Sequence, residues 1–220
     1  MIYLYALVAA PCALPDVAGI DGTPTACLDC DAIAAVVGEL EASRVEQSAE
    51  TILAHARVVD AVSGVNDATL PARFGTAFQA PDSLRAAVAE RADELRAALG
   101  LVRDCVELGL RVLAPRNEEA APMKSSGSAY LRGRLDAVRR SERAAAEVHD
   151  PLAQLARATT VSVRPTPDLL LSAGYLVPRE SVDEFRTKLV ELRELRPELT
   201  FACTGPWAPY SFATAEIAPA

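Results

Sequence analysis

The chain has 220 residues and a mass of 23.3 kDa, the size of two modest domains. Half of its residues are hydrophobic and 24% are charged, which excludes a disordered chain, a collagen-like chain and a disulfide-rich miniprotein. The formal net charge is −8, so the protein as a whole repels a phosphate backbone. The richest basic stretch, from Arg132 to Arg143, is interleaved with acidic residues at helical spacing, and we therefore expect no nucleic-acid binding.

The N-terminal residues Ile2–Ala9 are almost wholly apolar and predict a buried strand. They superficially resemble a signal peptide, but no Lys or Arg precedes them and Pro11 ends the apolar run. No other stretch approaches the roughly 18 apolar residues that a membrane span requires. We therefore expect a cytoplasmic protein with no membrane contact, whose five cysteines are reduced thiols.

The next segment predicts two strands and a helix. A loop rich in proline leads to short strands expected at Ala26–Asp29 and Ile33–Val37. From Arg44 to Ser63, apolar residues recur every three or four positions, as in an amphipathic helix. Ser43 is the expected N-cap of this helix, and Glu46 is placed to complete a capping box.

A further strand and a further helix complete the first half of the chain. The strand is expected at Leu70–Phe74. The helix is signalled by Pro81 and Asp82, with Asp82 as the candidate N-cap, and is expected to end at Gly100 as its C-terminal cap. We therefore assign residues 1–100 to an N-terminal α+β domain.

The second half of the chain predicts the element order of a ferredoxin-like βαββαβ domain. The expected elements are a strand at Val102–Leu113, a long helix at Leu131–Leu155, strands at Thr159–Arg164 and Leu169–Val177, a helix at Val182–Leu192 and a strand at Leu199–Thr204. The near-heptad apolar positions of the long helix predict a seam that packs on a sheet or a partner helix, and Asp150-Pro151 should kink or interrupt the helix. This order makes residues 101–220 a ferredoxin-like domain with a tail rich in aromatic residues and proline. The fold class is therefore α+β with two domains.

Few residues show a pattern that supports catalysis. The two histidines, His55 and His149, lie on predicted helices without a His, Cys or paired carboxylate three or four positions later, so we expect both to be structural. Cys27 and Cys30 have the spacing of half a zinc site or of a redox pair, but we favour the interpretation that they are two small residues in a hairpin. The sequence contains no glycine-rich phosphate loop and no nucleophile elbow.

Several segments carry a resemblance to a known family. They are Tyr3-Leu-Tyr5, His55–Ala61 followed by Leu70–Phe78, Leu171–Pro178, Asp183-Glu-Phe185, Leu199-Thr-Phe201 and Thr204–Phe212. Together they resemble the opening, central and closing patterns of the gas vesicle protein GvpL/GvpF family. The resemblance spans almost the whole chain, but the Cys27/Cys30 pair and the loop Pro115–Ser126 are not part of it.

The resemblance implies an assembly factor or minor structural component of gas vesicles, which are gas-filled protein shells. It implies a location at the gas vesicle within the cytoplasm, the hydrophobic shell protein GvpA and other gas vesicle proteins as partners, and a ferredoxin-like C-terminal domain. It implies no catalytic residue and no cofactor. A soluble acidic protein that covers the apolar face of a shell subunit would reduce its aggregation before assembly.

The C-terminal aromatic residues are the candidates for protein binding. Trp207, Tyr210 and Phe212 are of the types that dominate interfaces, and Pro206 and Pro209 hold the segment extended. The same aromatic residues could instead close a hydrophobic core. Both interpretations stay open at the level of sequence.

Two other function classes are compatible with the sequence. One is a ligand-binding regulatory module, because ferredoxin-like domains often bind small molecules across a sheet face. The other is a redox or metal enzyme built on Cys27 and Cys30. We expect binding without turnover, and therefore no enzyme.

Overall fold

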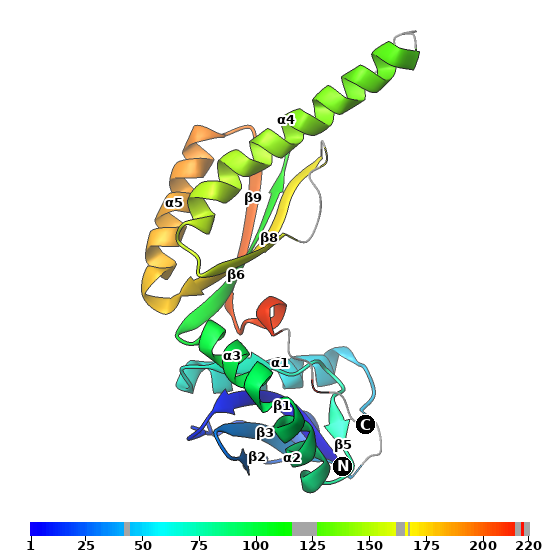
Figure 1. Ribbon diagram of the computed structural model, residues 1–220, viewed down its shortest axis with the longest axis vertical. Coiled ribbons are helices and arrows are strands. Elements are labelled where there is room, and N and C mark those ends of the chain that lie inside the picture. Colours follow the sequence, from blue (N-terminus) through cyan, green and yellow to red (C-terminus); the bar gives the residue numbers. More distant parts are fainter. Residues whose placement is uncertain (42–44, 116–126, 162–165, 167, 214–216, 218–220) are drawn as a thin grey trace. The chain divides into compact units, whose positions relative to one another are not determined.

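The computed structural model describes residues 1–41, 45–115, 127–161, 166, 168–213 and 217, apart from the side chains of residues 127–134 and 137. It divides into two compact units, the first formed by Met1–Val106 and Trp207–Ala220 and the second by Glu107–Pro206. Figure 1 shows the elements of each unit. The predicted division at residue 100 therefore differs in two ways: the boundary lies after Val106, and the C-terminal tail returns to the first unit.

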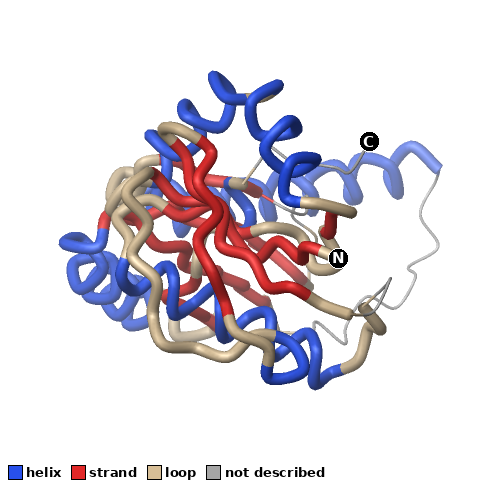
Figure 2. Tube along the Cα trace, turned by 90° about the horizontal axis from the view of Figure 1, so that it is seen from below, coloured by secondary structure: helices blue, strands red, loops and turns tan. Residues whose placement is uncertain are grey.

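The first unit is built on an antiparallel sheet whose order is β2-β3-β1-β4, with β5 also pairing with β1. Its elements are β1 (Ile2–Ala9), β2 (Thr25–Cys30), β3 (Ile33–Glu39), α1 (Ala49–Val65), β4 (Thr69–Pro71), β5 (Ala77–Phe78), α2 (Pro81–Glu90) and α3 (Ala92–Val102). Helix α1 contacts β1 and β4, α2 contacts β2 and β5, and α3 contacts β1 and β4. In Figure 2 the strands of this sheet lie between helices. Strand β1 is buried on both faces, as its continuous apolar sequence predicted.

An irregularity in β1 decides which side chains enter the core beneath α1. Leu4 pairs with Val37 and Ala6 with Val36, so Tyr5 is an extra residue in the ladder. A bulge of this kind turns two successive side chains to the same face. Tyr3, Tyr5 and Ala6 accordingly all belong to the core cluster that includes α1.

The helix starts differ from their predictions. Helix α1 begins at Ala49 with Ser48 as N-cap, and Ser48 and Thr51 form a reciprocal capping box; the predicted N-cap Ser43 lies outside the described residues. Helix α2 has Ala80 as N-cap and Pro81 in its first turn, so Asp82 is not the cap. Asp82 instead forms an ion pair with Arg85 one turn later.

The predicted second helix is two helices, and it ends later than predicted. Arg91 has φ −116° and ψ 20°, which interrupts the helical backbone between α2 and α3. Helix α3 continues through Gly100 to Val102. After the end of α3, Asp104 has left-handed backbone (φ 56°), which aspartate tolerates. The strand that was predicted from Val102 therefore begins at Cys105.

The second unit has the order strand, helix, strand, strand, helix, strand. Its elements are β6 (Cys105–Leu113), α4 (Gly127–Ala153), β7 (Ala158–Val161), β8 (Leu169–Pro178), α5 (Val182–Leu195) and β9 (Thr200–Trp207). The sheet order is β7-β8-β6-β9, and β7 pairs antiparallel with β8. The core contains alternate residues of β6 and β8 together with apolar residues of α4 and α5.

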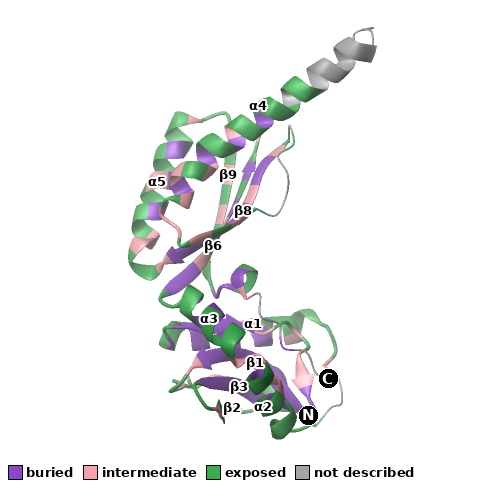
Figure 3. Cartoon of the chain, viewed as in Figure 1, coloured by how far each residue is buried: buried purple, intermediate pink, exposed green. Residues whose placement is uncertain are grey.

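Helix α4 packs through only part of its length. Val148 and Leu152 are buried in the core, whereas Leu135 and Val138 are exposed, and Figure 3 shows exposed residues along the helix where it extends past the sheet. The predicted seam therefore packs on the core of the second unit only in the C-terminal part of α4. Pro151 does not interrupt α4, because it lies in the last turn and the helix continues to Ala153. No described helix is long and apolar enough to cross a membrane.

Candidate functional site

Residues from three of the resembling segments meet in the core of the first unit. Strand β1 supplies Tyr3 and Tyr5, α1 supplies His55, and the turn between β4 and β5 supplies Phe74. The Tyr3 ring lies 4.9 Å from Tyr5, 5.7 Å from His55 and 6.3 Å from Phe74 between centroids. Edge-to-face aromatic pairs at such distances stabilise a core beyond the area they bury.

Hydrogen bonds link this aromatic cluster to the backbone of the Leu70–Phe78 segment. The Tyr3 hydroxyl accepts a hydrogen bond from the Gly75 amide (3.1 Å) and lies 3.0 Å from His55 Nδ1. His55 Nε2 lies 3.2 Å from the Ala72 carbonyl oxygen. Since a carbonyl only accepts, Nε2 carries the proton, and Tyr3 donates to Nδ1. The arrangement fixes one neutral tautomer of His55 and closes the turn around it.

The ionisation of these groups follows from their burial. His55 is 3% exposed, and desolvation lowers its pKa from 6.5 to about 4, although the hydrogen bond to Ala72 opposes the shift. Desolvation also raises the pKa of Tyr3 to about 12. Both groups are therefore neutral near pH 7. They link β1, α1 and the turn after β4 by hydrogen bonds, in agreement with the predicted structural role of His55.

The second tyrosine of β1 organises the loop before β2. The Ile20 amide donates a hydrogen bond to the Tyr5 hydroxyl at 2.8 Å. A Cβ atom on Gly19 would lie 2.3 Å from that hydroxyl oxygen, so no larger residue fits there without displacing Tyr5. The sequence contained a usable signal for both tyrosines, because a buried tyrosine needs a partner for its hydroxyl.

The C-terminal segment docks on α1 within the same unit. Ala208 is buried in the core cluster that holds Tyr3 and Tyr5, and its backbone amide hydrogen-bonds to the Asp60 carboxylate of α1. Desolvation raises the pKa of Asp60, and this hydrogen bond partly offsets the shift. Tyr210 is 42% exposed, but desolvation of its hydroxyl and the charge of Asp60 still raise its pKa. Sequence reasoning did not single out Asp60, although it lies in the resembling segment His55–Ala61.

The three candidate binding residues fall into two groups. Phe212 is 4% exposed, whereas Trp207 is 50% and Tyr210 42% exposed. The structure therefore places Phe212 in the protein interior and corrects its assignment as a contact residue. Ala208, which lies between Trp207 and Tyr210 in the sequence, is buried and anchors their segment to α1. The assignment of Trp207 and Tyr210 as contact residues stays a prediction.

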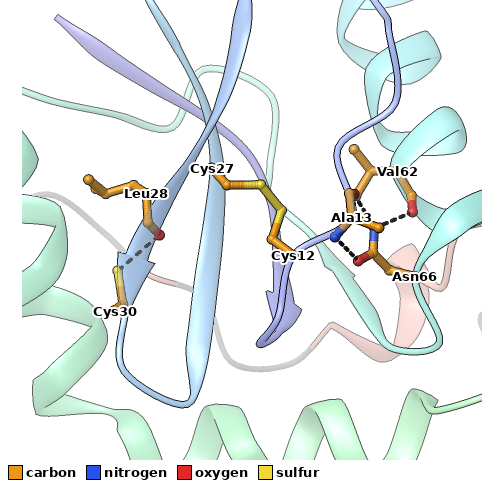
Figure 4. The surroundings of a disulfide bond; sticks show 7 residues. All are labelled: Cys12, Ala13, Cys27, Leu28, Cys30, Val62 and Asn66. Carbon is orange, nitrogen blue, oxygen red and sulfur yellow. Dashed lines mark hydrogen bonds between the residues drawn. A yellow bond between two sulfur atoms is a disulfide. The ribbon is translucent and has the colours of Figure 1, made fainter.

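The cysteines form a pair that was not predicted. Cys12 and Cys27 are joined by a disulfide with a Cα–Cα distance of 6.4 Å, which Figure 4 shows beside the hydrogen bonds of Asn66 to Ala13 and Val62. The expectation of five reduced thiols is therefore wrong. The Cys30 thiol lies apart, 3.7 Å from the Leu28 carbonyl oxygen, so the Cys27/Cys30 spacing does not bring two thiols together. In the described ranges, no group of three or more His, Cys, Asp or Glu side chains could hold a metal ion.

His149 has a place in the second unit like that of His55 in the first. Its Nδ1 atom lies 2.9 Å from the Tyr175 hydroxyl, and the Tyr175 ring lies 5.1 Å from Phe185 between centroids. Tyr175 and Phe185 are both fully buried in the core of this unit. The structural role predicted for His149 agrees with this position.

A pocket lies beside the aromatic cluster of the first unit. Its volume is about 600 Å³, and its walls include Met1, Phe74, Gly75 and Phe78. This pocket does not lie on the second sheet, where the ligand-binding alternative expected a site. That alternative stays a prediction.

Comparisons with known proteins agree in one family. The model of the family described as "Gas vesicle synthesis protein GvpL/GvpF" matches residues 1–214. Gas vesicle protein F1 of Halobacterium salinarum is 27% identical over 219 residues, covering 98% of this chain and 94% of that protein. Gas vesicle protein L of a Streptomyces species is 31% identical over 230 residues, covering 89% and 85%.

Two solved structures share the fold. The crystal structure of GvpF from Anabaena has a TM-score of 0.82 at 19% sequence identity, covering 98% of this chain and 96% of that one. The structure of GvpF from Microcystis aeruginosa has a TM-score of 0.79 at 21% identity, covering 97% and 99%. The mixed α/β fold with two sheets is thus that of known GvpF structures. With the match of the family model over residues 1–214, the resemblance carried by the sequence segments is confirmed: the chain belongs to the GvpL/GvpF family of gas vesicle proteins.

Proposed function

We propose that this protein binds the hydrophobic shell protein GvpA and limits its aggregation while gas vesicles form. The names of its relatives and of its family support a role in gas vesicle assembly. The observation that carries the finer proposal is the exposure of Trp207 and Tyr210 on a segment that the core anchors. Exposed aromatic side chains on a rigid support lose little conformational entropy when they bind.

The chemistry of the partner fits such a surface. A shell subunit with an apolar face aggregates unless another surface covers that face. An acidic protein with net charge −8 keeps the resulting complex in solution. On this proposal the protein acts in the cytoplasm at the forming vesicle, by binding and not by turnover, and needs no cofactor.

We also assign the second unit to the ferredoxin-like class. The βαββαβ order of β6 to β9 and the sheet order β7-β8-β6-β9 support this assignment. The unit would then supply a stable support from which the C-terminal segment leaves β9.

The test is co-expression of the affinity-tagged chain with GvpA, followed by measurement of GvpA retained in the soluble fraction. We expect retention by the native chain and a several-fold loss with Trp207→Ala or Tyr210→Ala. The matched control is Leu195→Ala, which removes a side chain that is 73% exposed on another element and should retain GvpA normally. Equal retention by all variants would refute the assigned surface, and no retention by the native chain would refute direct binding.

A further inference from the structure

Strand β9 forms one edge of the second sheet. It follows β6 at the end of the order β7-β8-β6-β9, and no described strand pairs with its outer side. From Thr200 to Gly205 the strand has no charged residue, and its residues are alternately exposed and half-buried. Natural sheets usually protect such an edge with charges, bulges or a covering element, because its unpaired backbone groups can pair with another strand.

The outward-facing backbone groups of β9 can be identified. Arg193 of α5 donates a hydrogen bond to the Phe201 carbonyl oxygen at 3.2 Å, so this carbonyl is reached from outside the ladder. Since hydrogen-bonding direction alternates along a regular strand, the backbone groups of Cys203 face the same side as those of Phe201. Phe201 and Cys203 define the outer edge.

Helix α5 places a second feature next to this edge. Arg193 reaches β9 through its hydrogen bond to Phe201. Burial raises the pKa of the neighbouring Cys203 thiol, and the positive charges of Arg193 and Arg186 oppose that shift. Arg186, Val190 and Glu194 are spaced by four residues and form one stripe on the same side of the helix. Val190 is 50% exposed, so its side chain is accessible between the two charged residues of the stripe.

The charge order of this stripe is complementary to itself. Read along α5 it is positive, apolar, negative, and an antiparallel copy presents negative, apolar, positive. Within the described part of the chain, Arg186 forms only a long ion pair, in which its Nη1 atom lies 3.9 Å from an oxygen of the exposed Asp183. A second copy would therefore place Arg186 opposite Glu194 twice and Val190 opposite its counterpart.

The middle of the α5 stripe lies level with the middle of β9. Arg193 contacts Phe201, and Val190 lies three residues, or roughly 4.5 Å, back along the helix. Because α5 and β9 are joined by a short connection at that end and run in opposite directions, this distance corresponds to between one and two strand residues, at roughly 3.3 Å each. Val190 is therefore level with the Ala202–Cys203 region, and one two-fold axis can pass by both elements.

We propose that the outer edge of β9 and the Arg186–Val190–Glu194 stripe of α5 form an isologous interface with a second copy of this chain. The two β9 strands pair antiparallel around Cys203 and join two sheets into one, and the two α5 helices pack antiparallel beside the junction. A strand from an unrelated protein could use the edge alone, but it would give no role to the self-complementary stripe.

The test is the oligomeric state of the full chain, measured by analytical ultracentrifugation across a wide range of concentration. We expect a monomer–dimer equilibrium. Arg186→Glu or Glu194→Arg alone places like charges opposite each other at two symmetric positions and should weaken dimerisation by roughly tenfold or more. The double variant Arg186→Glu, Glu194→Arg exchanges the charges and should restore dimerisation towards the native value.

The matched control is Lys188→Glu, which makes the same charge change as Arg186→Glu but two residues along α5, on the opposite side of the helix. It removes an exposed ion pair with Glu191 and should leave the dimer unaffected. A native chain that is monomeric at every concentration would overturn the proposal. So would a dimer that survives both single reversals, or a double variant as weak as the single ones. None of these outcomes bears on GvpA retention, which is tested at Trp207 and Tyr210 in the first unit.

Discussion

At the scale of single residues, the resembling segments meet because their polar atoms form hydrogen bonds with one another in a buried core. Tyr3, His55 and the turn at Gly75 come from distant positions, and each supplies the hydrogen-bond partner that another needs. A buried polar group without a partner is costly, so these identities depend on one another.

We predict that Tyr3→Phe destabilises the protein by about 1–3 kcal/mol, because the change leaves the Gly75 amide and His55 Nδ1 without their partner in the core. The measurement is urea unfolding at pH 7. His55→Gln combined with Tyr3→Phe should cost less than the sum of the two single changes, since both remove the same contact. Additive costs would show that the two side chains are not coupled.

We predict that stability falls as the pH is lowered from about 6.5 to about 4, in part because of His55. In the folded protein the pKa of His55 is about 4, below its ordinary value of 6.5. Between these values the unfolded chain binds more protons than the folded one, so stability is lost as the pH falls through this window and is fully present above it. The contribution is about 3 kcal/mol. His55→Gln should be less stable than the native chain at pH 7 but should lose less on acidification, and parallel pH profiles would contradict the assignment.

At the scale of elements, local irregularities set the geometry of the first unit. The bulge at Tyr5 turns Tyr3, Tyr5 and Ala6 to one face, and the break at Arg91 separates α2 from α3. The Cys12–Cys27 disulfide joins the segment after β1 to β2 across 15 residues of sequence. The bulge and the break each change the course of the chain at one position, whereas the disulfide ties two segments together.

We predict that removing this disulfide costs about 3 kcal/mol, the entropy of closing a loop of about 15 residues in the unfolded chain. The variant is Cys12→Ser with Cys27→Ser, compared by urea unfolding with the native chain under oxidising conditions. Cys30→Ser is the matched control and should change stability by less than about 0.5 kcal/mol. Addition of a reductant should bring the native chain to the stability of the double variant, and an unchanged native chain would argue against the bond.

At the scale of the whole molecule, the chain leaves the first unit after Val106 and returns to it at Trp207. The tail contributes the buried residues Ala208, Phe212 and Ile217. The first unit is therefore discontinuous in sequence, and its stability depends on residues that follow the second unit.

We predict that truncation after Pro206 destabilises the first unit by about 3 kcal/mol or more, because it removes a buried phenylalanine and a buried isoleucine. Hydrogen exchange followed by mass spectrometry should show faster exchange in β1 and α1, while β8 and α5 keep their protection. Equal loosening of both units, or of neither, would contradict the assignment of the tail to the first unit.

Much of the element order followed from local sequence. The apolar run of β1, the helical spacing in α1 and α5 and the turns between the strands of the second unit predicted elements that are present, because periodicity reports which face is buried. The hypotheses that Trp207 and Tyr210 contact a partner rested on residue type alone. Their exposure depends on where the tail docks, which no local pattern contains.

The sequence by itself determined that the fold mixes helices and strands, the strand and helix order of the second half, and the family, because these depend on residue periodicity and on motifs contiguous in the chain. The tertiary structure alone decided that Cys12 pairs with Cys27, that Phe212 is buried and that the tail belongs to the first unit. These outcomes depend on contacts between segments far apart in sequence, such as Asp60 with Ala208. Only folding brings such segments within a few ångströms of each other.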